Sequence, residues 1–180
     1  MVINMSLKIV KIVGVFLIYF MSFIFHSIYD LFPSYITSII FPVNESVWEH
    51  MKLLFYPILI WSVIEYFLIR KHDKKYNYLF QAFFTSFFSI VLYLLIYSLI
   101  TIFISESFIV SIILLFIVIV ITEVVGYFIF DRLNYSKGLN IIGLIGIILG
   151  VLLFWFFSYY PLETELFYDP MNSNYGILKK

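Results

Sequence analysis

Long apolar runs dominate the chain, and short polar breaks separate them. A helix that crosses a bilayer needs about 20 mostly apolar residues. Five runs reach that length, at approximately residues 9–28, 47–69, 78–104, 108–130 and 139–157. The pattern predicts an all-α integral membrane bundle of about five transmembrane helices. We expect a single transmembrane domain over residues 1–180, with an outer C-terminal tail at 158–180.

The composition agrees with lipid as the surrounding solvent. Of 180 residues, 63 % are hydrophobic and 12 % are charged, whereas a soluble domain has about 25 % charged residues. The formal net charge is zero, so no nucleic-acid partner is expected. Cysteine is absent, which excludes disulfides, thiolate nucleophiles and cysteine-ligated metals. The partner that the composition predicts is the lipid bilayer.

Lysine and arginine alternate between the polar breaks. They precede the first run and fill the breaks after the second and fourth runs: Lys8, Lys11, Arg70, Lys71, Lys74, Lys75, Arg132 and Lys137. The positive-inside rule therefore predicts a cytoplasmic N-terminus and a C-terminus outside. Residues 31–43 are apolar but contain Pro33 and Pro42 and are too short to cross. We expect this segment to be interfacial or re-entrant on the outer side.

Polar residues gather where the second run begins. Ser46 followed three residues later by Glu49 has the spacing of a helix-capping box. Glu49 and Lys52 are three residues apart and are expected to pair. Helix capping also accounts for Asn44 and its polar neighbours, but it leaves His50 unexplained.

His50 has the same predicted depth as His26. With a rise of 1.5 Å per residue, both imidazoles lie about 11–12 Å outside the centres of their helices. Nearby polar residues complete a candidate site on the outer side: His26, Asp30, Asn44, Glu45, Glu49, His50 and Lys52. Within it, His26, His50 and Glu49 have the donor types of a zinc site with two histidines and a carboxylate. Histidines that are only hydrogen-bonded are the structural alternative.

Two glutamates, Glu65 and Glu123, lie inside apolar runs. Glu65 is expected to reach toward Arg70, and Glu123 needs a polar partner on the third run. The candidates for that partner are Gln81, Thr85 and Ser86. A neutral, hydrogen-bonded Glu123 is the structural interpretation, and a proton or cation relay is the functional one.

The fifth run contains three small residues, Gly143, Gly146 and Gly150. Glycines at such spacing let two helix backbones approach closely. They predict either packing within the bundle or a homo-oligomer face.

Several strings resemble a family of small multi-pass membrane proteins from Gram-positive bacteria. They are H-S-I-Y-D at 26–30, F-P-V-N-E-S-V-W-E-H-M-K at 41–52, which includes N-E-S-x-W-E-H, and L-F-Y-D-P followed by Y-G in the tail. That family is a domain of unknown function. The resemblance implies a similar bundle in a bacterial cytoplasmic (plasma) membrane and assigns no activity.

Three functions are compatible with these residues. The first is a multi-pass membrane protein with a polar binding site at the outer leaflet and an activity that the residues do not name. The second is a metal-assisted intramembrane hydrolase or lipid-modifying enzyme, in which the histidines hold zinc and Glu49 activates water. The third is a small ion- or proton-coupled transporter that uses Glu65 and Glu123.

Overall fold

The computed structural model describes residues 6–69, 76–103 and 108–177. Helices of membrane length confirm the predicted all-α bundle, and there are five of them in this part of the chain. They are α1 (Leu7–Leu31), α3 (Val47–His50) continued by α4 (Lys52–Ile69), α5 (Tyr78–Phe103), α6 (Phe108–Arg132) and α7 (Lys137–Tyr159). The shorter elements are α2 (Tyr35–Ile40), η1 (Glu165–Phe167), β1 (Tyr168–Asp169) and β2 (Asn174–Tyr175).

Serine caps explain why two helices begin before their apolar runs. Ser6 accepts a hydrogen bond from the Ile9 amide, and Ser136 accepts one from the Leu139 amide. Each cap satisfies a backbone donor that the first helical turn leaves unpaired. Each helix therefore begins directly after its capping serine, two residues before the predicted apolar run.

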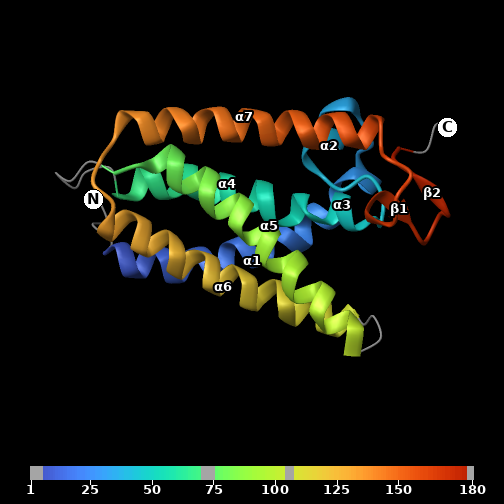
Figure 1. Cartoon of the computed structure of the whole chain (residues 1–180), viewed down its shortest axis with the longest axis horizontal. Helices are drawn as coiled ribbons and strands as arrows, with labels where there is room; N and C mark the ends of the chain where they lie inside the picture. The colour runs from blue at the N-terminus through green and yellow to red at the C-terminus, as the bar shows by residue number, and fades with distance from the viewer. Residues whose placement is uncertain (1–5, 70–75, 104–107, 178–180) are drawn as a thin grey trace.

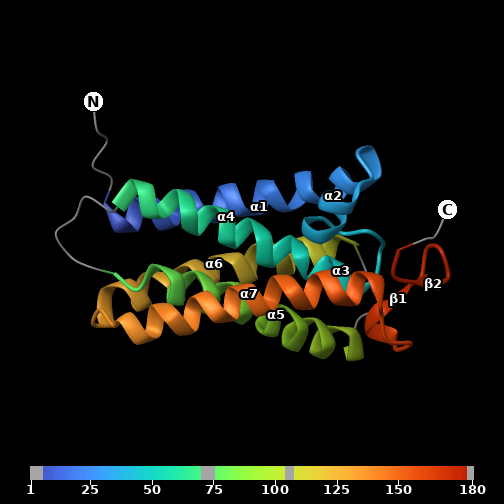
Figure 2. The same ribbon diagram turned by 90° about the horizontal axis from the view of Figure 1, so that it is seen from above.

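Helices α1, α4, α6 and α7 run roughly along the long axis of the molecule, and α5 crosses it obliquely (Figures 1 and 2). Helix α1 packs against α4 and α6, while α5 packs against α4, α6 and α7. The start of α1 and the ends of α4 and α6 lie at one end of the bundle, here called the N-terminal end (Figure 1, left). Helices α2 and α3 and the antiparallel β1–β2 hairpin lie at the other, here called the hairpin end.

The buried core runs through the middle of the bundle. Ile18, Ile58, Val118 and Ile119 are each fully buried and come from α1, α4 and α6. Large apolar side chains also cover the outer helix faces, where Phe20 and Leu99 are about 60 % exposed. Exposed apolar area on this scale suits contact with lipid rather than water. The five apolar helices thus indicate a membrane protein.

The glycines of α7 pack against other helices of this bundle. A Cβ atom at Gly143 would lie 2.4 Å from the backbone of Leu79 in α5. One at Gly146 would lie 2.2 Å from the ring of Phe83, also in α5. Gly150 meets the rings of Phe55 and Phe87. The small residues therefore let α7 pack closely on α5, which is the intramolecular alternative of the two predicted.

The position of Lys11 differs from the predicted one. This lysine was expected to precede the first membrane span, but α1 begins at Leu7 and Lys11 is 4 % exposed inside the bundle. Lys8, Arg132 and Lys137 do lie exposed at the N-terminal end. The predicted basic break of Arg70, Lys71, Lys74 and Lys75 lies outside the described residues.

The segment after α1 forms a short helix at the hairpin end. Ser34 and Thr37 cap α2 with a reciprocal capping box, and the Ser38 hydroxyl lies 2.8 Å from the Tyr159 hydroxyl of α7. Tyr35 and Ile36 are exposed. Residues 35–40 thus form a helix too short to cross a bilayer, and the choice between an interfacial and a re-entrant segment stays a prediction.

The tail folds back onto α3. The Phe167 ring lies 5.0 Å from that of Trp48, and the Ile177 amide donates to the Ser158 carbonyl. Gly176 adopts a φ of +64°, and a Cβ there would lie 2.9 Å from Pro161. Glycine therefore fits this turn for both conformational and steric reasons.

Candidate metal site and its supporting polar layer

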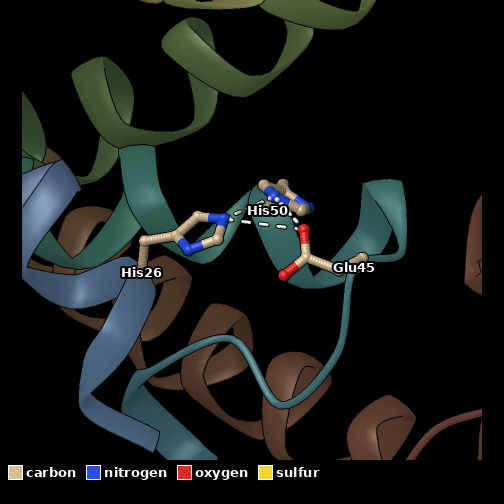
Figure 3. A group of neighbouring side chains, drawn as sticks. All are labelled: His26, Glu45 and His50. Carbon is tan, nitrogen blue, oxygen red and sulfur yellow. Dashed lines mark hydrogen bonds and ion pairs between the residues drawn. The ribbon is translucent and has the colours of Figure 1, made fainter. Parts of the chain in front are cut away.

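Three potential metal ligands converge at the hairpin end: His26, Glu45 and His50 (Figure 3). His26 Nε2 lies 3.1 Å from His50 Nε2. Glu45 Oε2 lies 3.6 Å from His26 Nε2 and 3.4 Å from His50 Nε2. The three side chains are 31–40 % exposed, so the group is open on one side.

Local structure brings these side chains together. His26 lies in the last turns of α1, and His50 is the last residue of α3. Glu45 lies directly before Ser46, the N-cap of α3. The Asn44 side chain accepts from the Ser46 amide and donates to the Gly176 carbonyl. The loop that carries Glu45 is thereby attached both to the helix start and to the tail.

A backbone contact orients the His50 ring. Its Nδ1 lies 2.9 Å from the Ser46 carbonyl oxygen, which can only accept, so Nδ1 carries the hydrogen. The lone pair of neutral His50 is then on Nε2, the atom that faces His26 and Glu45. Metal-binding histidines commonly have this arrangement, with the second ring nitrogen bonded to a carbonyl or carboxylate.

Glu45 supplies negative charge to the group. Hydrogen bonding to His26, and to His50 when that ring is protonated, holds the pKa of its carboxyl group well below its usual value of 4.5. The carboxylate is therefore ionised at neutral pH, as a metal ligand must be.

The three distances match one face of a small coordination tetrahedron. With metal–ligand bonds of about 2.0–2.1 Å, the edges of a zinc tetrahedron are about 3.3–3.4 Å long. The observed distances between the three ligand atoms, 3.1, 3.4 and 3.6 Å, lie close to that length on both sides.

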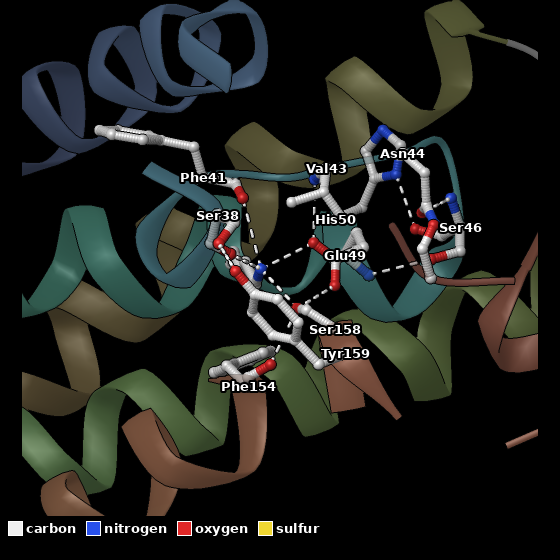
Figure 4. Close-up of polar contacts among 12 residues, drawn as sticks. Ser38, Phe41, Val43, Asn44, Ser46, Glu49, His50, Phe154, Ser158 and Tyr159 are labelled. Carbon is white, nitrogen blue, oxygen red and sulfur yellow. Dashed lines mark hydrogen bonds and ion pairs between the residues drawn. The ribbon is translucent and has the colours of Figure 1, made fainter. Parts of the chain in front are cut away.

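Glu49 does not join this group. It is 1 % exposed and turns into the bundle, where its carboxylate accepts from the Val43 amide and the Ser158 hydroxyl (Figure 4). The predicted capping box is half formed: Ser46 accepts from the Glu49 amide, but the Ser46 amide donates to Asn44. The carboxylate beside the two histidines is thus Glu45, where Glu49 was expected.

Lys52 confirms its predicted pairing with Glu49. Its Nζ lies 2.7 Å from Glu49 Oε2, and both side chains are buried. The same ammonium donates to the Ser38 carbonyl at 2.7 Å and to the Ser158 hydroxyl at 2.8 Å. This buried ion pair links the start of α4 with α2, α3 and α7.

The two intramembrane glutamates meet a partner that differs from those expected. Lys11 Nζ lies 2.8 Å from Glu65 Oε1 and 3.4 Å from Glu123 Oε2. Glu65 is fully buried, and its predicted partner Arg70 lies outside the described residues. The correction has a simple cause: α1 packs between α4 and α6 and brings an ammonium group to both carboxylates.

Family comparison adds one finding. A sequence model described as a family of unknown function, DUF6512, matches residues 2–177. The chain belongs to this family. Comparisons with curated proteins and with solved structures give no match. DUF6512 membership confirms that the chain belongs to a family of unknown function.

The sequence-predicted site of this DUF6512 chain separates into two layers. His26, Glu45 and His50 form the exposed layer, and Glu49 and Lys52 form the buried one. Asn44 supports the loop between them. Asp30 is exposed at the end of α1 and is not one of the three converging ligands.

Sequence reasoning missed Ser38 and Ser158. Both bond to Lys52, and both are fully or nearly fully buried. Ser158 carried a usable signal, because it is a hydroxyl near the end of an otherwise apolar run. Ser38 contributes through its backbone carbonyl, for which side-chain identity gives no signal.

Proposed function

We propose that this chain is a multi-pass membrane protein that binds one zinc-class divalent metal ion through His26, Glu45 and His50. The observation that carries the proposal is the triangle formed by two imidazole nitrogens and one carboxylate oxygen, with edges of 3.1, 3.4 and 3.6 Å. The fixed His50 tautomer and the ionised Glu45 give two of these atoms the protonation state that a metal requires.

Zinc is the metal that suits these ligands. Neutral imidazole and carboxylate bind it at bond lengths that agree with the observed spacing. Three protein ligands leave the fourth tetrahedral position for an exchangeable ligand, as in sites where zinc binds water or a substrate group. The partial exposure of all three side chains provides room for such a ligand.

We place the hairpin end outside the cell, with the N-terminus in the cytoplasm of a bacterial plasma membrane. Exposed Lys8, Arg132 and Lys137 at the N-terminal end support this orientation, as do exposed Glu163 and Glu165 at the hairpin end. The resemblance to Gram-positive proteins supports the choice of membrane. Reporter fusions after residues 75 and 180 should report opposite sides, and a common side would contradict the orientation.

Metal binding has more support than either alternative function. A hydrolase of the expected kind needs Glu49 as a general base, but its carboxylate is committed to Lys52, Ser158 and the Val43 amide. A transporter needs a polar route between the two ends. Among the described residues, fully buried apolar side chains such as Ile18 and Val118 separate the glutamates of the N-terminal end from the histidines.

The test is a metal count on purified protein. Bound metal is removed from the detergent-solubilised protein with a chelator. The protein is then incubated with Zn²⁺ at neutral pH and desalted, and its zinc content is measured by elemental mass spectrometry. We expect one zinc per chain in the wild type. His26→Ala, His50→Ala and Glu45→Gln should each lose it, because each removes one of three protein ligands.

Glu163→Gln is the matched control, since it removes an exposed carboxylate at the same end but outside the group. It should retain one zinc per chain. Zinc retained in the double variant His26→Ala/His50→Ala would show that the ion binds elsewhere. Absence of zinc from the folded wild type would overturn the proposal. Substitution by Co²⁺ adds a spectrum that distinguishes tetrahedral from octahedral coordination.

A further inference from the structure

Three charged side chains from three helices meet near the N-terminal end. Lys11 of α1, Glu65 of α4 and Glu123 of α6 are 4 %, 0 % and 2 % exposed. The Lys11 ammonium lies within 2.9 Å of both Glu65 oxygens and 3.4 Å from Glu123 Oε2. It also lies 4.9 Å above the ring of Phe130. We call these three residues the charged triad.

Two glycines make space for the charged triad. A Cβ atom at Gly126 of α6 would lie 2.9 Å from Lys11 Nζ. One at Gly14 of α1 would lie 2.3 Å from Trp61 Nε1 and 3.1 Å from Glu123 Oε2. Any larger residue at either position would displace a polar side chain. The sequence thus accommodates the charged triad in a core that is otherwise apolar.

The charges of the triad do not balance. One ammonium faces two carboxylates, and in the described residues no second lysine or arginine contacts either carboxylate. The side chains of Gln81 and Thr85, which border the Cβ position of Gly126 together with Lys11 Nζ, are neutral. A net negative charge buried in a low-dielectric interior is strongly unfavourable. The triad therefore requires one further positive charge.

Glu123 is the carboxylate that is free to accept the further positive charge, because its oxygens have few partners. Apart from its ion pair with Lys11, neither of its oxygens has a hydrogen-bond partner among the described residues. It lines a cleft of about 290 Å³ between α1 and α6 whose walls include Ile12, Val15 and Val120. The cleft is thus lined in part by a nearly fully buried carboxyl group without a hydrogen-bond partner among the described residues.

The cleft connects the triad with the N-terminal end. Lys8, which is exposed near the start of α1, and Tyr127 of α6 also line it. Tyr78 of α5 is the other titratable group that faces Glu65. Apart from Lys11, no lysine or arginine contacts Glu123 within the part of the chain that the structure describes.

We propose that Lys11, Glu65 and Glu123 form a binding site for one exchangeable proton, shared between the two carboxyl groups. In its occupied form the site contains one ammonium, one carboxylate and one carboxylic acid, so its net charge is zero. The proton is exchanged through the cleft from the N-terminal end. This site is independent of the metal group, which lies at the opposite end of the bundle.

The requirement for a neutral site predicts the number of buried carboxylic acids in the wild type and in three variants. At neutral pH the wild type should contain one buried carboxylic acid. Glu65→Gln and Glu123→Gln should each contain none, because the remaining carboxylate is balanced by Lys11. Lys11→Met should contain two, because both carboxyl groups then lack a cation.

Infrared spectroscopy of the protein in lipid vesicles measures these numbers, because a carboxylic acid has a C=O stretching band separate from that of a carboxylate. The band should shift in D₂O, since the proton is exchangeable. Glu163→Gln, which removes an exposed acid, is the control and should leave the band unchanged. The expected band areas for wild type, either glutamine variant and Lys11→Met are in the ratio of one to zero to two.

Three results would overturn the proposal. The first is a wild type without the band, and the second is a band that persists in both glutamine variants. The third is a band that appears only when sodium is replaced by a bulky organic cation, which would identify the site as a metal-cation site. The glutamine variants keep the side-chain shape, so they decide the matter even if Lys11→Met does not fold.

Discussion

Replacing Lys52 with methionine removes the cation from the buried layer beneath the metal group. Methionine is similar to lysine in length, so the volume is largely conserved and the main change is the loss of charge and hydrogen bonds. Glu49 would remain 1 % exposed without its ammonium partner. The Ser38 carbonyl and the Ser158 hydroxyl would lose a donor. We expect the hairpin end to become less stable and to bind zinc more weakly.

The magnitude follows from this environment. Removing one partner of a buried ion pair costs about 3–5 kcal/mol, because the other charge stays buried and uncompensated. For a domain of this size, about 1 kcal/mol corresponds to a shift of about 2–4 °C in Tm. The expected decrease in Tm for Lys52→Met is therefore about 6–20 °C.

Thermal unfolding in detergent, followed by circular dichroism, measures the effect. Lys137→Met removes an exposed lysine and should change the free energy of unfolding by less than about 0.5 kcal/mol. The double variant Lys52→Met/Glu49→Gln removes both charges and should recover at least half of the lost stability. A decrease below about 2 °C for Lys52→Met, or a double variant no more stable than the single one, would refute the reasoning.

Three further predictions concern packing, pH and the tail. Gly143→Ala should lower the free energy of unfolding by about 1–3 kcal/mol through overpacking against α5. Gly138→Ala should not lower it in the same thermal assay, because the atom nearest to its Cβ would be Ser136 Oγ at 3.6 Å. Acidification from about pH 7 to pH 5 should leave Glu45 ionised, because its pKa is below 4.5; its contribution to zinc binding is present above that pH and is lost only as pH falls toward its lowered pKa. An infrared band of protonated Glu45 in the metal-free protein at pH 5, absent from Glu45→Gln, would contradict this. Asn44→Ala removes the 2.9 Å hydrogen bond to Gly176 and should cost about 1 kcal/mol, measured as faster proteolysis of the tail with α7 intact.

The sequence by itself determined the number of long apolar helices and their approximate positions. The length of an apolar run is a local property, and the thickness of the bilayer supplies the scale against which it is read. The expected run at 139–157 is observed as α7, Lys137–Tyr159, which starts two residues earlier because Ser136 caps it. The depth of His26 and His50 was also predictable, because a helix has a constant rise per residue.

Helix geometry alone could have improved one part of the site. Successive residues on a helix point about 100° apart, so Glu49 and His50 cannot both face the same ligand. Glu45, which lies before the helix, is free of that restriction. This signal was available in the sequence but required the exact start of α3, which Ser46 defines through its hydrogen bond to the Glu49 amide.

Only the tertiary structure decided which side chains meet. Lys11 pairs with Glu65, 54 positions away, and Ser158 bonds to Glu49 across 109 positions. Such contacts depend on which helices are neighbours and on how each is rotated about its axis. In a chain whose helices are apolar on nearly every side, the hydrophobic pattern leaves that rotation undetermined. The few buried charges and small residues fix it, because they are stable only where they find partners or space.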